Sequence, residues 1–171
     1  EGKESPIINP DANGNAWFVN KIQFVKNADG EMKGLDKFNS KETAIINQSE
    51  FGSWFKNDSA NFAKDSSATI TLDSYQPNNL KYTSVNSKDG LAVFSEMYYE
   101  KGWKALIDGK ETSIMRADYT LRAIIVPAGK HSIEFKFEPQ VVKTGSAITL
   151  VSCIGMLFLL VGGIYFERRK P

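Results

Sequence analysis

The sequence predicts a mainly β chain. We expect an antiparallel, jelly-roll-like β-sandwich, preceded by a small irregular α/β part and followed by one transmembrane helix. Three observations lead to this prediction. Twenty consecutive residues near the C-terminus, 147–166, carry no charge. Short runs of alternating apolar and polar residues, separated by turn signals, fill residues 68–140, whereas the first 67 residues lack this regularity.

The region 68–140 repeats one pattern of strand and tight turn. Strands are predicted over 69–75, 80–85, 91–99, 103–107, from 113 onward, over 119–126 and over 131–137. Asp108-Gly109 between two of them is a strong hairpin signal. The run LAVFSEMYY at 91–99 is apolar enough for a central strand that is buried on both faces. About seven antiparallel strands at this spacing are typical of a β-sandwich.

The first part of the chain mixes element types. Residues 16–25 predict a strand, 30–38 a short helix with Met32, Leu35 and Phe38 at helical spacing, and 43–47 a short strand. Residues 57–67, rich in Ser, Asn, Ala and Asp, predict a loop. We therefore divide the chain into five parts: an N-terminal part at 1–67, the sandwich at 68–140, a juxtamembrane linker at 141–146, the transmembrane helix at 147–166 and a cytoplasmic tail at 167–171.

The uncharged tail predicts both a membrane span and its direction. Twenty helical residues cover about 30 Å, the thickness of a bilayer's hydrocarbon core. Arg168, Arg169 and Lys170 follow the span, whereas the residues before it have a nearly balanced charge. Short basic segments stay in the cytoplasm, so we expect the domain outside and the C-terminus inside. Because the chain begins with Glu1, we also expect it to be a piece of a longer protein.

The span carries small residues that suggest contact with other helices. Thr149, Ser152, Gly155 and Gly162 fall near one helical stripe, and small residues let membrane helices approach closely. The alternative is that glycine is simply common in such helices. The predicted partners are therefore the lipid bilayer and other transmembrane helices.

Several kinds of chemistry are disfavoured by composition. The near-zero net charge argues against nucleic acid, which requires a clustered basic face. One histidine, His131, and one cysteine, Cys153 inside the span, give no zinc-ligand spacing, and no nucleophile elbow is present. We predict no catalytic residue, metal or cofactor. Glu96, within the apolar run, is either a buried acid with a raised pKa or, as we favour, a glutamate that faces an edge or pairs with Arg116 or Arg122.

Aromatic residues offer candidate sugar contacts, because sugars stack on exposed aromatic faces. The candidates are Trp54, Tyr98, Tyr99 and Tyr119. Trp17 and Trp103 follow the alternation of their strands and are better explained as core residues.

Three segments, taken in order, resemble the C-terminal region of the bacterial YfhO-like membrane proteins. They are NGNAWFV at 13–19, FSEMYYEKGWKALIDGK at 94–110, and LRAIIVPAGKHSIEFKFEP at 121–139 followed by a terminal span. The resemblance covers nearly the whole chain and is weakest between residues 30 and 67. These proteins are polytopic and related to glycosyltransferases of the GT-C type. The resemblance implies catalytic acidic residues in early extracytoplasmic loops, which this chain does not contain.

We therefore expect a non-catalytic extracytoplasmic accessory domain of a polytopic glycosyltransferase-like protein in the bacterial inner membrane. The resemblance implies a role in cell-envelope glycan or glycolipid assembly, with a glycan or lipid-linked sugar as partner, and it assigns any transferase activity to the longer parent protein. The alternatives are a membrane-anchored carbohydrate-binding protein, a purely structural or assembly module, and an enzyme confined to this fragment.

Overall fold

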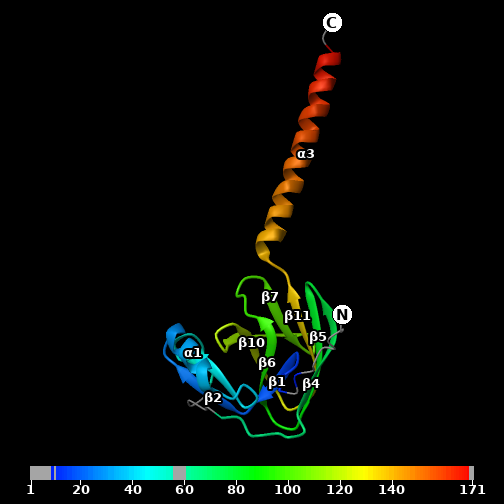
Figure 1. Cartoon of the computed structure of the whole chain (residues 1–171). Helices are drawn as coiled ribbons and strands as arrows, with labels where there is room; N and C mark the ends of the chain where they lie inside the picture. The colour runs from blue at the N-terminus through cyan, green and yellow to red at the C-terminus, as the bar shows by residue number, and fades with distance from the viewer. Residues whose placement is uncertain (1–8, 10, 56–60, 170–171) are drawn as a thin grey trace, which may run out of the picture.

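The computed structural model describes residues 9, 11–55 and 61–169 and shows a β-rich head from which one long helix extends (Figure 1). The elements, in chain order, are β1 (Ala16–Val19), β2 (Lys21–Val25), α1 (Ala28–Gly34), η1 (Leu35–Lys37), β3 (Thr43–Asn47), α2 (Gln48–Phe51), η2 (Gly52–Trp54), β4 (Thr69–Gln76), β5 (Asn79–Asn86), β6 (Gly90–Met97), β7 (Trp103–Ile107), β8 (Lys110–Thr112), β9 (Met115–Ala117), β10 (Leu121–Val126), β11 (Gly129–Phe137) and α3 (Gln140–Arg168).

Two antiparallel sheets form the sandwich. The first has the strand order β1-β6-β10-β9 and the second the order β4-β5-β11-β7-β8. Ile133 and Phe135 of β11 share the inward face of the second sheet and are fully buried. The Phe94 ring from the first sheet contacts the rings of Phe135 and Tyr82 edge to face, at centroid distances of 4.8 and 5.0 Å. The predicted antiparallel β-sandwich is confirmed.

Strand β6 lies between two hydrophobic cores. Ala92 and Phe94 face the core between the two sheets, whereas Leu91 and Val93 face a second core on the other side. All four side chains are fully buried, so the burial predicted for residues 91–99 is correct for 91–94. It is wrong for residues 95–99, which are partly or fully exposed, and the strand ends at Met97. Successive side chains of a strand point to opposite faces, so a strand that is apolar at every position needs cover on both. The parallel pair β2–β3, together with α2, supplies that cover as a third layer.

The single strand predicted over 16–25 is two strands in different sheets. β1 pairs with β6, whereas β2 pairs with β3. The chain changes direction at Asn20, where the backbone N–H groups of Asn20 and Lys21 both donate to the Glu42 carbonyl. The domain boundary at residue 67 stays a prediction, although β1 belongs to the same sheet as β6 and β10.

The predicted helix over 30–38 is α1 followed by η1. Asn27 caps α1, its side-chain oxygen accepting the Gly30 N–H at 2.9 Å. Met32 was expected on the apolar face but is half exposed, and the buried residue of this helix is Glu31. The short helices α2 and η2 were not predicted. Part of the loop predicted at 57–67 and the end of the predicted tail (170–171) lie outside the described residues.

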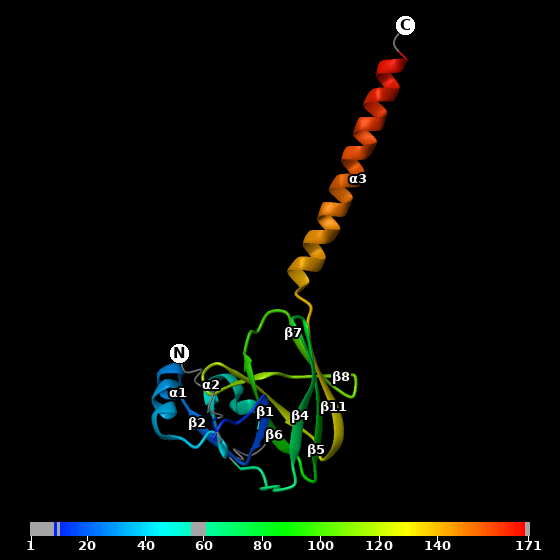
Figure 2. The ribbon, with the colours of Figure 1, turned by 45° about the vertical axis from the view of Figure 1, so that its right-hand side comes forward.

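Helix α3 leaves the head directly from the last strand, β11 (Figure 2). It begins at Gln140, so the linker predicted at 141–146 is helical, and Pro139 sets the backbone immediately before the first turn. Among the described residues it is the one helix long and apolar enough to cross a membrane, and its apolar stretch is not buried against the head.

The junction between head and helix is fixed by the loop that joins β6 and β7. The Glu138 N–H donates to the Gly102 carbonyl at 2.6 Å. Gly102 has φ +113°, and a Cβ placed there would lie 2.8 Å from the Phe137 ring and 3.1 Å from the Pro139 Cβ. Only glycine combines this conformation with this close approach. The loop and the start of the helix are therefore in direct contact.

Candidate functional site

A groove lined by aromatic side chains lies at the end of the head nearest α3. Its volume is about 450 Å³, within the range of small-molecule sites. We call it the aromatic groove. Its lining residues are Phe51, Trp54, Tyr98, Tyr99, Glu100, Trp103, Lys104, Glu111, Thr112, Ser113 and Ile114. Three of the four side chains predicted as sugar contacts, Trp54, Tyr98 and Tyr99, thus lie in one groove.

One side of the groove is a stack of rings from α2, η2 and the β6–β7 loop. The Phe51 ring meets the Trp54 ring edge to face at 5.2 Å and the Tyr98 ring at 6.1 Å. Phe51 is buried and belongs to the second core, whereas Trp54 is 39% exposed. The buried ring therefore anchors an exposed one. Partial burial raises the pKa of the Tyr98 phenol, so its hydroxyl is protonated and can donate or accept a hydrogen bond.

The other side of the groove is Trp103, whose ring is held from behind by a buried arginine. The Arg122 guanidinium carbon lies 4.0 Å from the centroid of the Trp103 ring, and its Nε–H donates to the Met97 carbonyl at 2.7 Å. Burial lowers the pKa of Arg122, and the nearby Glu96 carboxylate opposes that shift. A cation over the ring face stabilises its orientation. Trp103 packs against the sandwich core, as expected, and also lines the groove.

Polar groups complete the lining of the groove. Lys104 and Glu111 form an ion pair at 3.3 Å, and Thr112 and Ser113 add hydroxyl groups. Glu100 is exposed at the same site. Aromatic faces next to carboxylates and hydroxyls match the amphipathic surface of a sugar ring. Among the described residues, no group of three or more His, Cys, Asp or Glu side chains could hold a metal ion.

Tyr119, the fourth predicted contact, does not line this groove. It is 38% exposed and lies in the turn between β9 and β10, with φ +68°. The turn is nevertheless adjacent, because the Tyr98 N–H donates to the Thr120 carbonyl at 2.6 Å. Tyr119 therefore stands beside the groove.

The ion pairs predicted for Glu96 are not formed among the described residues. Glu96 is half buried. Arg116 instead binds Glu31 at 2.9 Å and Glu50 at 3.0 Å. His131 lies at the end of the head away from the groove, where its Nδ1 is 2.6 Å from the Asp108 carboxylate.

A buried acidic cluster was missed at the sequence level. Glu31, fully buried, pairs with Arg116, and Asp118 in the following turn is 6% exposed. The Asp118 Oδ1 accepts the Ile45 N–H at 2.8 Å, which ties the turn to β3. Burial raises the pKa of Asp118 to about 6. The only sequence signal was Glu31 on a short helix whose apolar residues are few.

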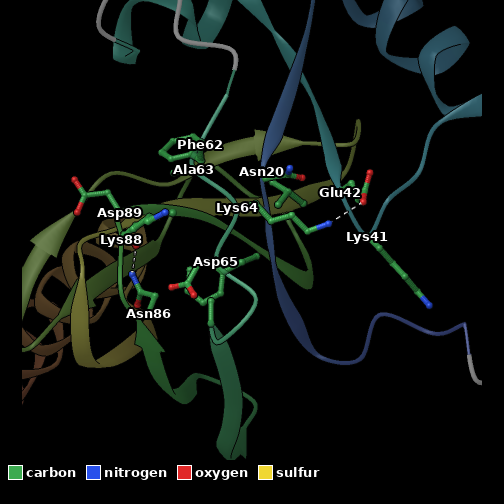
Figure 3. Close-up of a pocket in the computed structure, with 14 residues that line it drawn as sticks. Asn20, Lys41, Glu42, Phe62, Ala63, Lys64, Asp65, Asn86, Lys88 and Asp89 are labelled. Carbon is green, nitrogen blue, oxygen red and sulfur yellow. Dashed lines mark hydrogen bonds and ion pairs between the residues drawn. The ribbon is translucent and has the colours of Figure 1, made fainter.

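A second, smaller pocket of about 280 Å³ lies at the opposite end of the head, where β5 ends and β6 begins. Figure 3 shows the residues that line it. Its lining carries three lysines, Lys41, Lys64 and Lys88, and three carboxylates, one of which, Glu42, pairs with Lys64 at 3.4 Å. Asn86 donates to the carbonyls of Lys88 and Pro127, holding two turns together. The charges of this pocket are balanced, and its polar groups mainly serve local structure.

The head and helix together define a membrane protein with a β-sandwich domain carried at one end of a membrane-spanning helix. Residues 53–149 match the family described as "Bacterial membrane protein YfhO", and the chain belongs to that family. This region covers the strands of the sandwich from β4 onward, every lining residue of the groove except Phe51, and the first turns of α3.

One curated relative is the "Uncharacterized protein YfhO" of Bacillus subtilis (strain 168), which is 33% identical over 97 residues. The aligned part is 57% of this chain and 10% of that relative, so the chain corresponds to a small part of the relative's length. No solved structure matches the chain.

Proposed function

We propose that this chain is an extracytoplasmic accessory domain that holds a sugar of a glycan or lipid-linked glycan in the aromatic groove, close to the membrane surface. The observation that carries the proposal is the convergence of Trp54, Tyr99 and Trp103 on one groove at the α3 end of the head. In this proposal the domain serves a larger glycosyltransferase-like protein in cell-envelope glycan or glycolipid assembly and performs no chemistry itself.

The physical case rests on what each lining group offers a sugar. Exposed aromatic rings stack on the apolar face of a pyranose, and each ring offers a large, flat apolar area for that contact. The Arg122 guanidinium stacked on Trp103 keeps that ring in place before a ligand arrives, which lowers the ordering cost of binding. Glu100, Thr112 and Ser113 supply acceptors and donors for hydroxyl groups.

The proposal is tested with the full chain in detergent micelles. Two of its three tryptophans, Trp54 and Trp103, line the groove, so intrinsic fluorescence reports on binding directly. We expect a saturable change when glucose, galactose or N-acetylglucosamine oligosaccharides are added at millimolar concentration. No change with any of them would leave the structural or assembly module as the better explanation.

Matched variants locate the site. Tyr99→Ala removes a groove ring that is 55% exposed, and we expect about tenfold weaker binding, equivalent to 1.4 kcal/mol. Tyr75→Ala removes a ring that is 61% exposed and lies outside the groove, so it should bind like the parent chain. Equal weakening by both variants would place the binding elsewhere.

We also propose the orientation on which an extracytoplasmic role depends. Arg168 and Arg169 follow the apolar part of α3, which favours a cytoplasmic C-terminus in the bacterial inner membrane. A reporter enzyme fused after residue 171 should be accessible only from the cytoplasmic side. Access from outside intact cells would reverse the orientation and remove the role.

A further inference from the structure

Large exposed side chains gather at the end of the head from which α3 departs. Tyr75, Met97, Tyr99 and Tyr119 are 61%, 72%, 55% and 38% exposed. They lie in or next to three connections, the β4–β5 hairpin, the β6–β7 loop and the β9–β10 turn. Tyr75 and Met97 are among the last two residues of β4 and β6, whereas Tyr99 and Tyr119 lie in the loop and the turn themselves. We call these four side chains the membrane rim. We propose that the membrane rim rests on the lipid headgroup layer and gives the head a second contact with the bilayer beside α3.

The three connections are tied to the last strand and the start of the helix by backbone hydrogen bonds. The Phe137 N–H donates to the Asn78 carbonyl in the β4–β5 hairpin at 2.9 Å. The Glu138 N–H donates to the Gly102 carbonyl in the β6–β7 loop at 2.6 Å. That loop in turn holds the β9–β10 turn, since the Tyr98 N–H donates to the Thr120 carbonyl. The β4–β5 hairpin and the β6–β7 loop therefore flank the point where α3 begins, whereas the β9–β10 turn lies farther from it (Figures 1 and 2).

The distance between the rim and the hydrocarbon core fits this contact. The uncharged part of α3 starts at Thr144, four residues after the helix begins at Gln140, which corresponds to a rise of about 6 Å. Each headgroup layer is about 5–8 Å thick. Transmembrane helices tilt by about 20° on average, which brings one side of the head closer to the bilayer. Tyrosine and methionine side chains projecting from the rim thus reach the headgroups.

The chemistry of the rim also favours the lipid interface over other occupants. Tyrosine is enriched at membrane–water interfaces, where its ring sits among the headgroups and its hydroxyl meets water. The nearby charges are mixed: Lys104 pairs with Glu111, Lys136 with Glu134, and Lys143 with Glu138. The contact is therefore expected to rest on apolar and aromatic groups. This inference depends on α3 crossing the bilayer. Tyr99 belongs to both the rim and the aromatic groove, so the rim is tested at Met97 and Tyr75, which do not line the groove.

The test measures the depth of single labelled positions in the full chain. Cys153 is the only cysteine, so Cys153→Ser allows one labelled cysteine at a time. Met97→Cys and Tyr75→Cys each place an environment-sensitive fluorophore on the rim. Val85→Cys is the matched control, because Val85 is 44% exposed but lies near the other end of β5, about 20 Å from the rim.

The labelled chains are reconstituted into phosphatidylcholine nanodiscs that carry a nitroxide on the headgroup. We expect both rim probes to shift to shorter wavelength and to be quenched at least twofold more strongly than the Val85 probe. If either rim probe is quenched no more than the Val85 probe, the rim does not lie on the lipid. That result is the one expected if the rim faces another protein segment. Because each labelled side chain is more than 40% exposed in the parent chain, folding is retained and is checked by circular dichroism.

Discussion

Replacing Asp118 by asparagine tests how a buried carboxyl group controls the stability of the head. The Asp118 Oδ1 accepts the Ile45 N–H at 2.8 Å, and an asparagine oxygen can keep this bond. Asparagine also tolerates the left-handed conformation at this position, where φ is +50°. The Oδ2 atom is buried and, among the described residues, has no hydrogen-bond partner. The substitution therefore removes a buried charge and puts the asparagine NH2 group in the place of Oδ2.

The sign and size of the effect follow from proton linkage. Burial, with a smaller contribution from the Glu31 carboxylate, raises the pKa of Asp118 from 3.8 to about 6. The folded state thus holds this proton more tightly than the unfolded state. The resulting stability is fully present below pH 3.8 and is lost as the pH rises through 6. Between pH 7 and pH 5 the folded state gains about 1.3 kcal/mol, and the full difference of the two pKa values corresponds to about 3 kcal/mol.

The contribution of Asp118 to the free energy of unfolding is measured by urea unfolding of the full chain in micelles. Unfolding is followed by tryptophan fluorescence at pH 5, 6 and 7. Lowered pKa values at Asp108, Glu134 and Glu138 act in the opposite direction, since their stabilisation is lost as the pH falls. Those groups are common to both proteins, so only the difference between Asp118→Asn and the parent chain is interpreted. The variant should be the more stable at pH 7, and its advantage should shrink by about 1.3 kcal/mol at pH 5. Parallel curves for the two proteins would refute the reasoning.

Three further substitutions use the same unfolding assay. Arg116→Met leaves the fully buried Glu31 carboxylate without its ion-pair partner and should cost about 3–5 kcal/mol; a loss below 1 kcal/mol would contradict that role. Tyr82→Phe removes a buried hydroxyl without a hydrogen-bond partner among the described residues and should change stability by less than about 1 kcal/mol, so a large loss would mean that the hydroxyl is satisfied. Gly102→Ala places a Cβ at a position with φ +113°, 2.8 Å from the Phe137 ring, and should lower the free energy of unfolding by about 1–3 kcal/mol. Unchanged stability would show that the backbone at the junction can shift to accept the side chain.

The strand pattern was predictable from local sequence because each signal has a local cause. The hairpin at Asp108-Gly109 forms with both residues at positive φ, as its sequence demands. The alternation of Ile133 and Phe135 places both in the core. The apolar residues 91–94 of β6 predicted burial on both faces, and both faces are covered there, whereas the polar Ser95 and Glu96 interrupt the run and the residues after them are not buried.

The features that were missed depend on contacts between distant segments. The strand predicted over 16–25 divides at Asn20 because two N–H groups there bind the Glu42 carbonyl, more than twenty residues away. The ion pair between Arg116 and Glu31 joins residues that are 85 positions apart, and no local sequence pattern indicates it. Alternation along the chain cannot reveal such partners.

The sequence predicted the types of residue in the candidate site, but only some of the residues that line it. Trp54 was identified from its irregular segment, and Tyr98 and Tyr99 from their residue type, although they were placed in a strand predicted to be buried; the fold brings all three to one groove. Trp103 was assigned to the core because it follows strand alternation, yet its ring lies at the boundary and serves both core and groove. Tyr119 was included for its residue type alone and stands outside the lining.

The third layer described above sets a practical limit on how this protein can be shortened. The family match begins at residue 53, after β1, β2 and β3. A fragment that starts at that position would lack the strands that cover Leu91 and Val93, and the apolar face of β6 would be exposed to solvent. Such a fragment should aggregate, whereas one that starts before β1 keeps the strands that cover this face. Recombinant work on relatives of this chain should therefore reach upstream of the recognisable family region.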